Sequence, residues 1–97
     1  MLLYMIDNFS NPAEVQRKAI QYLGKNTIIY LSSRKNKKYM VLYNNKWVHF
    51  GAMGYEDFTK HKDKERRDAY LRRATKIKSN WKDNKYSPNN LAINLLW

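Results

Sequence analysis

The segment 38–50 constrains the fold most, because it has the pattern of a β-hairpin. Its two halves, Lys38–Tyr43 and Lys46–Phe50, are rich in β-branched and aromatic residues, which favour strands. Between them stand Asn44 and Asn45. Asn tolerates positive φ better than most residues, so this pair suits a tight two-residue turn. The sequence therefore predicts two antiparallel strands at the centre of the chain.

Further elements are predicted on both sides of this hairpin. Residues 27–32 form a β-branched and aromatic run that predicts a third strand. Asn11 and Pro12 are a good cap and a good first helical residue, and Gly24 is a typical residue after a helix end, which together predict a helix over about 12–23.

Two more helices are predicted after the sheet. Asp63 can cap a helix over about 63–78, whose apolar stripe would be Tyr70, Ala74, Ile77 and Trp81. Ser87 and Pro88 begin another helix, over about 88–96. Residues 55–62 are a connector with room for one helical turn. A small antiparallel sheet packed with helices is an α+β fold.

Length and charge set the class of protein. The chain has 97 residues, which corresponds to a single basic domain over 1–97. Its 19 Lys and Arg and 8 Asp and Glu give a formal net charge of +11. Repulsion at that charge is relieved by a polyanion such as DNA, RNA, an anionic membrane or an acidic protein. Charge alone implies no sequence specificity.

The absence of cysteine excludes a disulfide framework and a thiolate metal site, and it favours a reducing compartment. The apolar start, Met1–Ile6, is short and lacks a basic flank. We therefore expect neither a signal peptide nor a membrane span there, but a strand or an anchoring segment.

Positive charge is concentrated in two stretches. The stretch 60–78 contains nine basic and three acidic residues, and the stretch 34–38 is a basic turn. A helix that presents several Arg and Lys can neutralise phosphates and release their counterions, whereas the plainer interpretation is a solvated face with local ion pairs. The predicted phosphate contacts are Arg34, Lys35, Lys37, Lys38, Lys46, Lys60, Lys62, Arg66, Arg67, Arg72, Arg73 and Lys76.

Aromatic residues beside these bases could stack on unpaired nucleobases. Tyr39, Tyr43 and Trp47 are the candidates. The favoured interpretation is core packing, because so short a chain needs its large apolar side chains inside. The terminal Leu95-Leu96-Trp97 is predicted to dock on the same fold, with a partner subunit as the alternative.

Imidazole and carboxylate groups are close together in sequence at His49, Asp57, His61 and Asp63, near Tyr55. Such groups could bind a divalent metal or act as acid and base. Their spacing matches no metal signature, and no nucleotide-binding or nucleophile motif is present. We therefore expect neither an enzyme nor a cofactor.

From Lys38 onward the chain has a distinctive pattern, formed by 38–41, 46–51, 54–63, Arg66-Arg67, Tyr70 and Arg73, and by 86–97. In this pattern it resembles a family of small basic proteins of unknown function from nucleocytoplasmic large DNA viruses of the mimivirus-, phycodnavirus- and marseillevirus-like groups. Its distinctive positions are His49, Phe50, Gly51, Gly54, Tyr55, Asp57, His61, Asp63 and Tyr70. The chain departs from the family at Arg73-Ala74, where Arg-His is usual, and near Asn89-Asn90.

The resemblance implies a viral source and no established activity. It implies a virion component, present in the particle and in the cytoplasm or nucleus of the infected host cell. The first hypothesis is nonspecific binding to nucleic acid, with DNA favoured over RNA. The second is a minor capsid or scaffold protein whose apolar ends, Met1–Ile6 and Leu91–Trp97, dock on other virion proteins. The third is a small metal-dependent nuclease.

Overall fold

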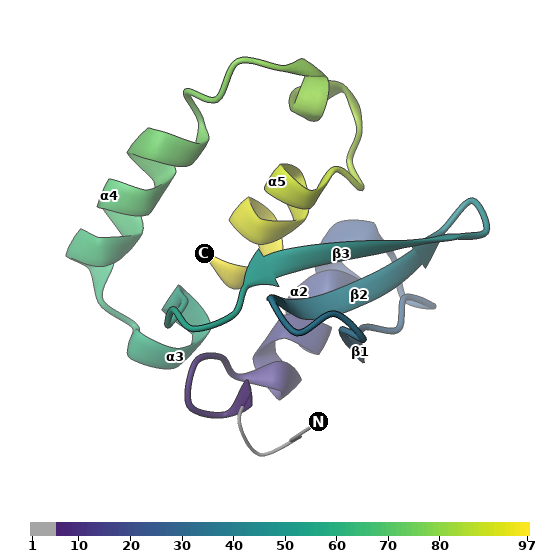
Figure 1. Cartoon of the computed structure of the whole chain (residues 1–97), viewed down its shortest axis with the longest axis horizontal. Coiled ribbons are helices and arrows are strands. Elements are labelled where there is room, and N and C mark those ends of the chain that lie inside the picture. Colours follow the sequence, from purple (N-terminus) through teal and green to yellow (C-terminus); the bar gives the residue numbers. More distant parts are fainter. Residues whose placement is uncertain (1–5) are drawn as a thin grey trace.

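The computed structural model describes residues 6–97, which form a three-stranded antiparallel sheet with helices beside it (Figure 1). The α+β class is therefore confirmed. Five of the six residues in the predicted anchoring segment at the start lie outside the described residues. The elements are α2 (Pro12–Leu23), β1 (Tyr30–Leu31), β2 (Lys37–Tyr43), β3 (Lys46–Ala52), α3 (Phe58–His61), α4 (Lys64–Ala74), η1 (Asn80–Asp83), α5 (Pro88–Leu91) and η2 (Ala92–Leu96).

The predicted hairpin is confirmed as β2 and β3. Asn44 and Asn45 have φ angles of 51° and 62°, as a tight primed turn requires. The strands pair from Tyr43 with Lys46 at the turn to Lys37 with Ala52 at the far end. They extend slightly beyond the predicted bounds.

The predicted strand over 27–32 is much shorter than expected, because only β1 pairs with β2. The side chain of Gln16 on α2 explains the difference. Its amide nitrogen donates to the carbonyl of Thr27 and its amide oxygen accepts from the N–H of Ile29, both at 2.8 Å. These backbone groups bond a helix side chain instead of a neighbouring strand.

The helix predicted over 12–23 is confirmed as α2. The side chain of Asn11 accepts from the N–H of Glu14, and Pro12 occupies the first turn. After the last residue, Gly24 has a φ of 127° and its N–H reaches the carbonyl of Ile20. Val15 and Ala19 face the core.

The helix predicted over 63–78 stops early, at Ala74. The hydroxyl of Thr75 donates to the carbonyl of Leu71 at 2.6 Å, and such back-bonding competes with the helix. Ile77 is 52% exposed, so the predicted apolar stripe does not continue there. Trp81 belongs to the separate turn η1.

The helix predicted over 88–96 is present as α5 followed by η2. Ser87 caps α5, accepting from the N–H of Asn90. In η2 the turn widens, and the N–H of Trp97 donates to the carbonyl of Ala92, five residues earlier. Leu95 and Leu96 are both buried, so this end docks on its own fold as predicted. The alternative, docking of Leu91–Trp97 on other subunits, is wrong for these leucines.

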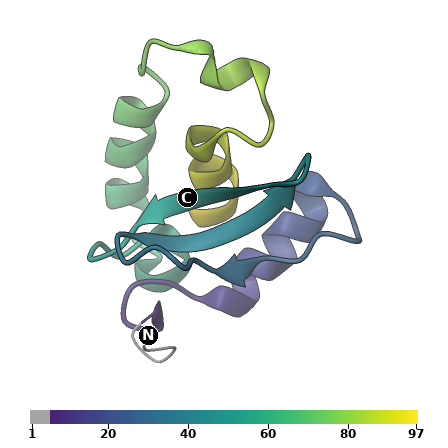
Figure 2. The same ribbon diagram turned by 45° about the vertical axis from the view of Figure 1, so that its right-hand side comes forward.

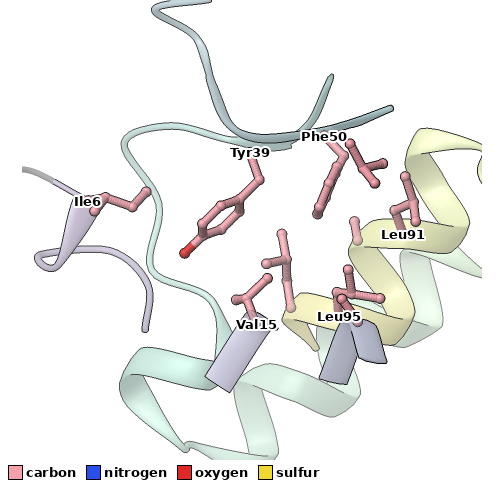
Figure 3. Close-up of a cluster of buried hydrophobic side chains, with 10 residues drawn as sticks. Ile6, Val15, Tyr39, Phe50, Leu91 and Leu95 are labelled. Atoms are coloured by element: carbon pink, nitrogen blue, oxygen red, sulfur yellow. The ribbon is translucent and has the colours of Figure 1, made fainter. Parts of the chain in front are cut away.

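The core lies between the hairpin, α2 and the terminal helices (Figures 1 and 2). Figure 3 shows Tyr39 and Phe50 pointing from the sheet toward Val15, Leu91 and Leu95. All five side chains are essentially inaccessible to solvent. Within residues 6–97, every helix is too short or too polar to reach across a bilayer.

Candidate nucleic-acid interface

Helix α4 carries the largest group of cations, and its start is built as predicted. The carboxylate of Asp63 accepts from the N–H groups of Glu65 at 2.9 Å and Arg66 at 3.3 Å. An acidic side chain also complements the positive end of the helix dipole. With Ala74 as its one buried residue, α4 leaves most of its side chains in solvent.

Three cations near the start of α4 are held by the rest of the protein. Lys62 donates to the carboxylate of Glu14 on α2 at 2.5 Å, and Arg66 donates to Glu56 at 3.2 Å. Arg67 donates from Nε to the backbone oxygen of Trp97 at 2.8 Å and lies over the ring of Phe58. These side chains therefore fasten α4 to its neighbours as well as adding charge.

Lys62, Arg66 and Arg73 are predicted phosphate contacts that do not all face the same hollow. Arg66 and Arg73 line one hollow together, while Lys62 turns to α2. The other cations predicted on this stretch, Lys60, Arg72 and Lys76, are exposed and form no ion pair within residues 6–97.

The basic turn between β1 and β2 reaches the hollow lined by α4 through one residue, Lys37. Arg34 and Lys35 are exposed, and Lys37 lines the same hollow as Arg66 and Arg73. The turn is fixed where the N–H of Met53 donates to the carbonyl of Asn36. Two basic clusters about 30 residues apart in sequence thus meet at this hollow through Lys37, Arg66 and Arg73.

Lys46 does not belong to this group. It pairs with Tyr43 at the Asn44-Asn45 turn, whereas Lys37 pairs with Ala52 at the opposite end of the hairpin. Seven residues of strand separate those ends by roughly 20 Å. Lys46 is exposed and lies apart from these cations, so its predicted phosphate contact stays a separate prediction.

Lys38 is wrongly predicted as a phosphate contact. Its side chain is 3% exposed, and its ammonium bonds the fully buried carboxylate of Asp57 at 3.1 Å. Burial lowers the pKa of Lys38, and the charge of Asp57 partly offsets this. The pair connects β2 to the start of α3. In the sequence, Lys38 stands in a strand whose residues alternate between two faces, and no neighbouring residue indicated that its side chain would be buried.

The histidines and carboxylates that suggested a metal or catalytic site are held in separate interactions. The imidazole of His49 bonds the hydroxyl of Ser32 at 2.7 Å. His61 accepts at Nδ1 from the N–H of Asp63, and its buried Nε2 has no partner. Within residues 6–97, no three such groups lie close enough to hold a metal ion.

Burial lowers the pKa of both histidines. For His49, Arg34 and Lys37 add to this effect. For His61 the neighbouring Arg66 does so, while Asp63, Glu56 and Asp57 oppose it. Both imidazoles are therefore neutral at pH 7.

The aromatic candidates divide between the core and the surface. Tyr39 is buried, as predicted. Tyr43 is 36% exposed and stacks on Tyr86, and Trp47 is 45% exposed and packs edge-on against Tyr30. Core packing is therefore wrong for Tyr43 and Trp47.

Tyr55 is the aromatic residue that sequence reasoning missed as a stacking candidate. It follows Gly54, which has a φ of 98°, and its side chain is 71% exposed. Its exposure could not be read from the sequence, because it depends on how the chain leaves β3. Tyr55 lines the same hollow as Arg66 and Arg73.

Two other positions of the resemblance are structural. Phe50 is in the core, and Gly51, with a φ of 84°, passes close to the terminal helix. A Cβ at Gly51 would lie 2.8 Å from Cδ1 of Leu96, so a larger residue would require the Leu96 side chain to move. Tyr70 stacks on Trp97 with ring centroids 4.3 Å apart, which attaches α4 to the end of the chain.

Comparison with known proteins gives one match. Residues 27–74 match a family of unknown function (DUF5754). The matched range begins at the segment bonded by Gln16 and ends with the last residue of α4. It therefore includes the hairpin, the basic turn 34–38 and α4, and it ends before Lys76 and Lys78. No curated protein and no solved structure matches the chain.

Proposed function

We propose that this chain binds nucleic acid without sequence preference, through the phosphate backbone, as a component of a virion. The observation that carries the proposal is the shortage of internal partners for its charge. All 19 basic side chains lie within residues 6–97, and three of them form ion pairs with acidic residues. The remaining sixteen form no ion pair within the described residues, and most of them are exposed to an external polyanion.

The proposed contact surface takes its cations from the β1–β2 turn and from the stretch 60–76, and we call it the basic face. Three of its cations, Lys37, Arg66 and Arg73, line one hollow. The exposed cations assigned to it beside these are Arg34, Lys35, Lys60, Arg72 and Lys76. Contacts of this kind neutralise phosphates and carry no sequence information. DNA is favoured over RNA, and a virion role is favoured, because the sequence motifs resemble proteins of large DNA viruses.

The test is the salt dependence of binding to a DNA duplex. Each phosphate contact contributes about 0.9 to the slope of log affinity against log salt concentration. The double variant Lys35→Glu/Arg72→Glu removes two cations of the basic face. We expect its slope to fall by about 2.

The matched control is Lys25→Glu/Lys46→Glu, which changes the net charge equally at exposed positions outside the basic face. We expect a smaller change of slope for this variant. Equal effects of the two double variants would contradict the proposed surface. No binding of the natural sequence at low salt would remove the proposal altogether.

A structural role on other virion proteins is the second candidate, and one observation favours it. Ile28, Tyr30, Leu42 and Trp47 are each between 44% and 58% exposed and line one shallow hollow. Exposed apolar residues gathered in this way are typical of contact surfaces. If this role holds, Leu42→Ser/Trp47→Ser should reduce incorporation into particles while duplex binding stays unchanged.

A further inference from the structure

The basic face contains a pocket of about 650 Å³, within the size range of small-molecule sites. It lies between α4, the terminal helices and the end of β3. Both ribbon views show α4 running beside α5 and η2 (Figures 1 and 2). The side chains of Ala69, Ala92 and Leu96 provide an apolar lining.

The charge around this pocket is positive. Lys37, Lys38, Arg66 and Arg73 line it, against one acidic residue, Glu56. Lys38 is paired with Asp57 and Arg66 with Glu56. Within residues 6–97, Lys37 and Arg73 therefore remain as cations without an acidic partner, and they come from the two basic clusters.

An aromatic ring is available at the same place. Tyr55 lines the pocket and is 71% exposed, although a phenol ring gains free energy from burial. Its ring makes no stacking contact with another aromatic residue of the described chain. Exposed rings beside cations are the elements from which single-strand binding sites are made.

We propose that this pocket takes one unpaired nucleotide of a single strand. Its base stacks on Tyr55 over the apolar lining, and its phosphates contact Lys37 and Arg73. A nucleotide carries a flat base a few ångströms from its phosphate, and this matches an exposed aromatic ring beside two cations. The inference rests on the proposed function, which it deepens by naming the form of nucleic acid that the basic face prefers.

The test compares two labelled single strands of equal length, one with bases and one abasic, by fluorescence anisotropy. Both carry the same phosphates, so the difference in affinity reports the base. We expect the strand with bases to bind about tenfold more tightly, as one stacked base allows. A free 5′-mononucleotide at equal concentration should not displace it, because it lacks the other phosphate contacts.

The variants are Tyr55→Ala and Arg73→Ala, with Arg72→Ala as the control. Arg72 is the preceding residue of α4, is equally basic and exposed, and does not line the pocket. We expect Tyr55→Ala to abolish the preference for bases and leave abasic binding unchanged. Arg73→Ala should weaken the strand with bases several-fold more than Arg72→Ala does.

Equal affinity of the natural protein for the two strands would overturn this inference and leave phosphate binding intact. Equal losses in Arg73→Ala and Arg72→Ala would overturn it too, as would displacement by the free mononucleotide. Failure of both strands to bind at low salt would instead remove the proposed function. Thermal melts show whether each variant is folded, which we expect because Tyr55, Arg72 and Arg73 are exposed.

Discussion

Asp57 joins three parts of the chain through one buried carboxylate. It caps α3 by accepting from the N–H and the hydroxyl of Thr59, and it pairs with Lys38 on β2. Thr59 also bonds Ser10, whose hydroxyl accepts from Tyr39 at 2.6 Å. Burial raises the pKa of the Tyr39 hydroxyl, which keeps it a donor. This network connects the start of the chain, the sheet and α3.

Removing one charge of the Lys38–Asp57 pair should be costly. In Asp57→Asn the ammonium of Lys38 stays buried without a counter-charge, and breaking such pairs costs about 3–5 kcal/mol. We expect urea denaturation to show a loss of that size. Lys38→Met/Asp57→Asn should recover most of it, since no charge is then buried. A stability within about 0.5 kcal/mol of the natural sequence in the single variant would contradict this account.

The lowered pKa values of the two histidines predict how the free energy of unfolding depends on pH. Because folding lowers the pKa of His61 and His49, the unfolded chain binds more protons below the ordinary His pKa of about 6.5. Stability should therefore be complete above that pH and fall as the pH drops through and below it. Melting temperatures between pH 8 and pH 5.5 measure this. His61→Gln should flatten the profile, and an unchanged profile would show that His61 is not involved.

At the scale of elements, the hairpin and α4 differ in how they are held. The hairpin has ladder hydrogen bonds and three core residues, Tyr39, Val41 and Phe50, that belong to one cluster with residues of α2 and the terminal helices. Helix α4 has one buried residue, Ala74, and depends on the stack of Tyr70 on Trp97. Local opening is expected first where few apolar groups are buried.

The change Trp97→Ala tests this difference, because it removes the ring on which Tyr70 stacks. We expect amide hydrogen exchange in α4 to accelerate about tenfold or more, while β2 and β3 keep their protection relative to global unfolding. Tyr86→Ala is a matched control, because it removes a comparable stack on Tyr43 that does not contact α4. Similar acceleration in α4 for both variants would show that α4 is not held by Trp97.

For the whole molecule, the balance of charge is the dominant feature. A net charge of +11 sits on a chain of 97 residues, and within residues 6–97 only three of the 19 basic side chains form an ion pair. Two clusters of this charge are brought together by the fold, which raises their mutual repulsion. A bound polyanion or a high salt concentration relieves it.

The melting temperature should therefore rise when the salt concentration increases from about 20 mM to about 500 mM, because the Debye length falls well below the spacing of exposed cations. Uncharged osmolyte at equal osmolality is the control. At low salt, single-stranded DNA should produce a comparable rise. A melting temperature that is constant or falls with salt would mean that repulsion among the cations does not limit stability.

The sequence alone determined the elements whose signals are local: the hairpin with its Asn44-Asn45 turn, α2 with its cap and closing glycine, and the starts of α4 and α5. Caps and turns depend on neighbouring residues, so they can be read along the chain.

Tertiary structure decided the rest, because it depends on residues far apart in sequence. Hydrogen bonds from the Gln16 side chain limit the first strand. The ion pair with Asp57 accompanies the burial of Lys38. The docking of α4 places Lys37, Arg73 and Tyr55 around one pocket. No local pattern encodes which charge will be buried or which cations will become neighbours. The composition set the sign and size of the charge, and only the packing of the elements determined where it could act.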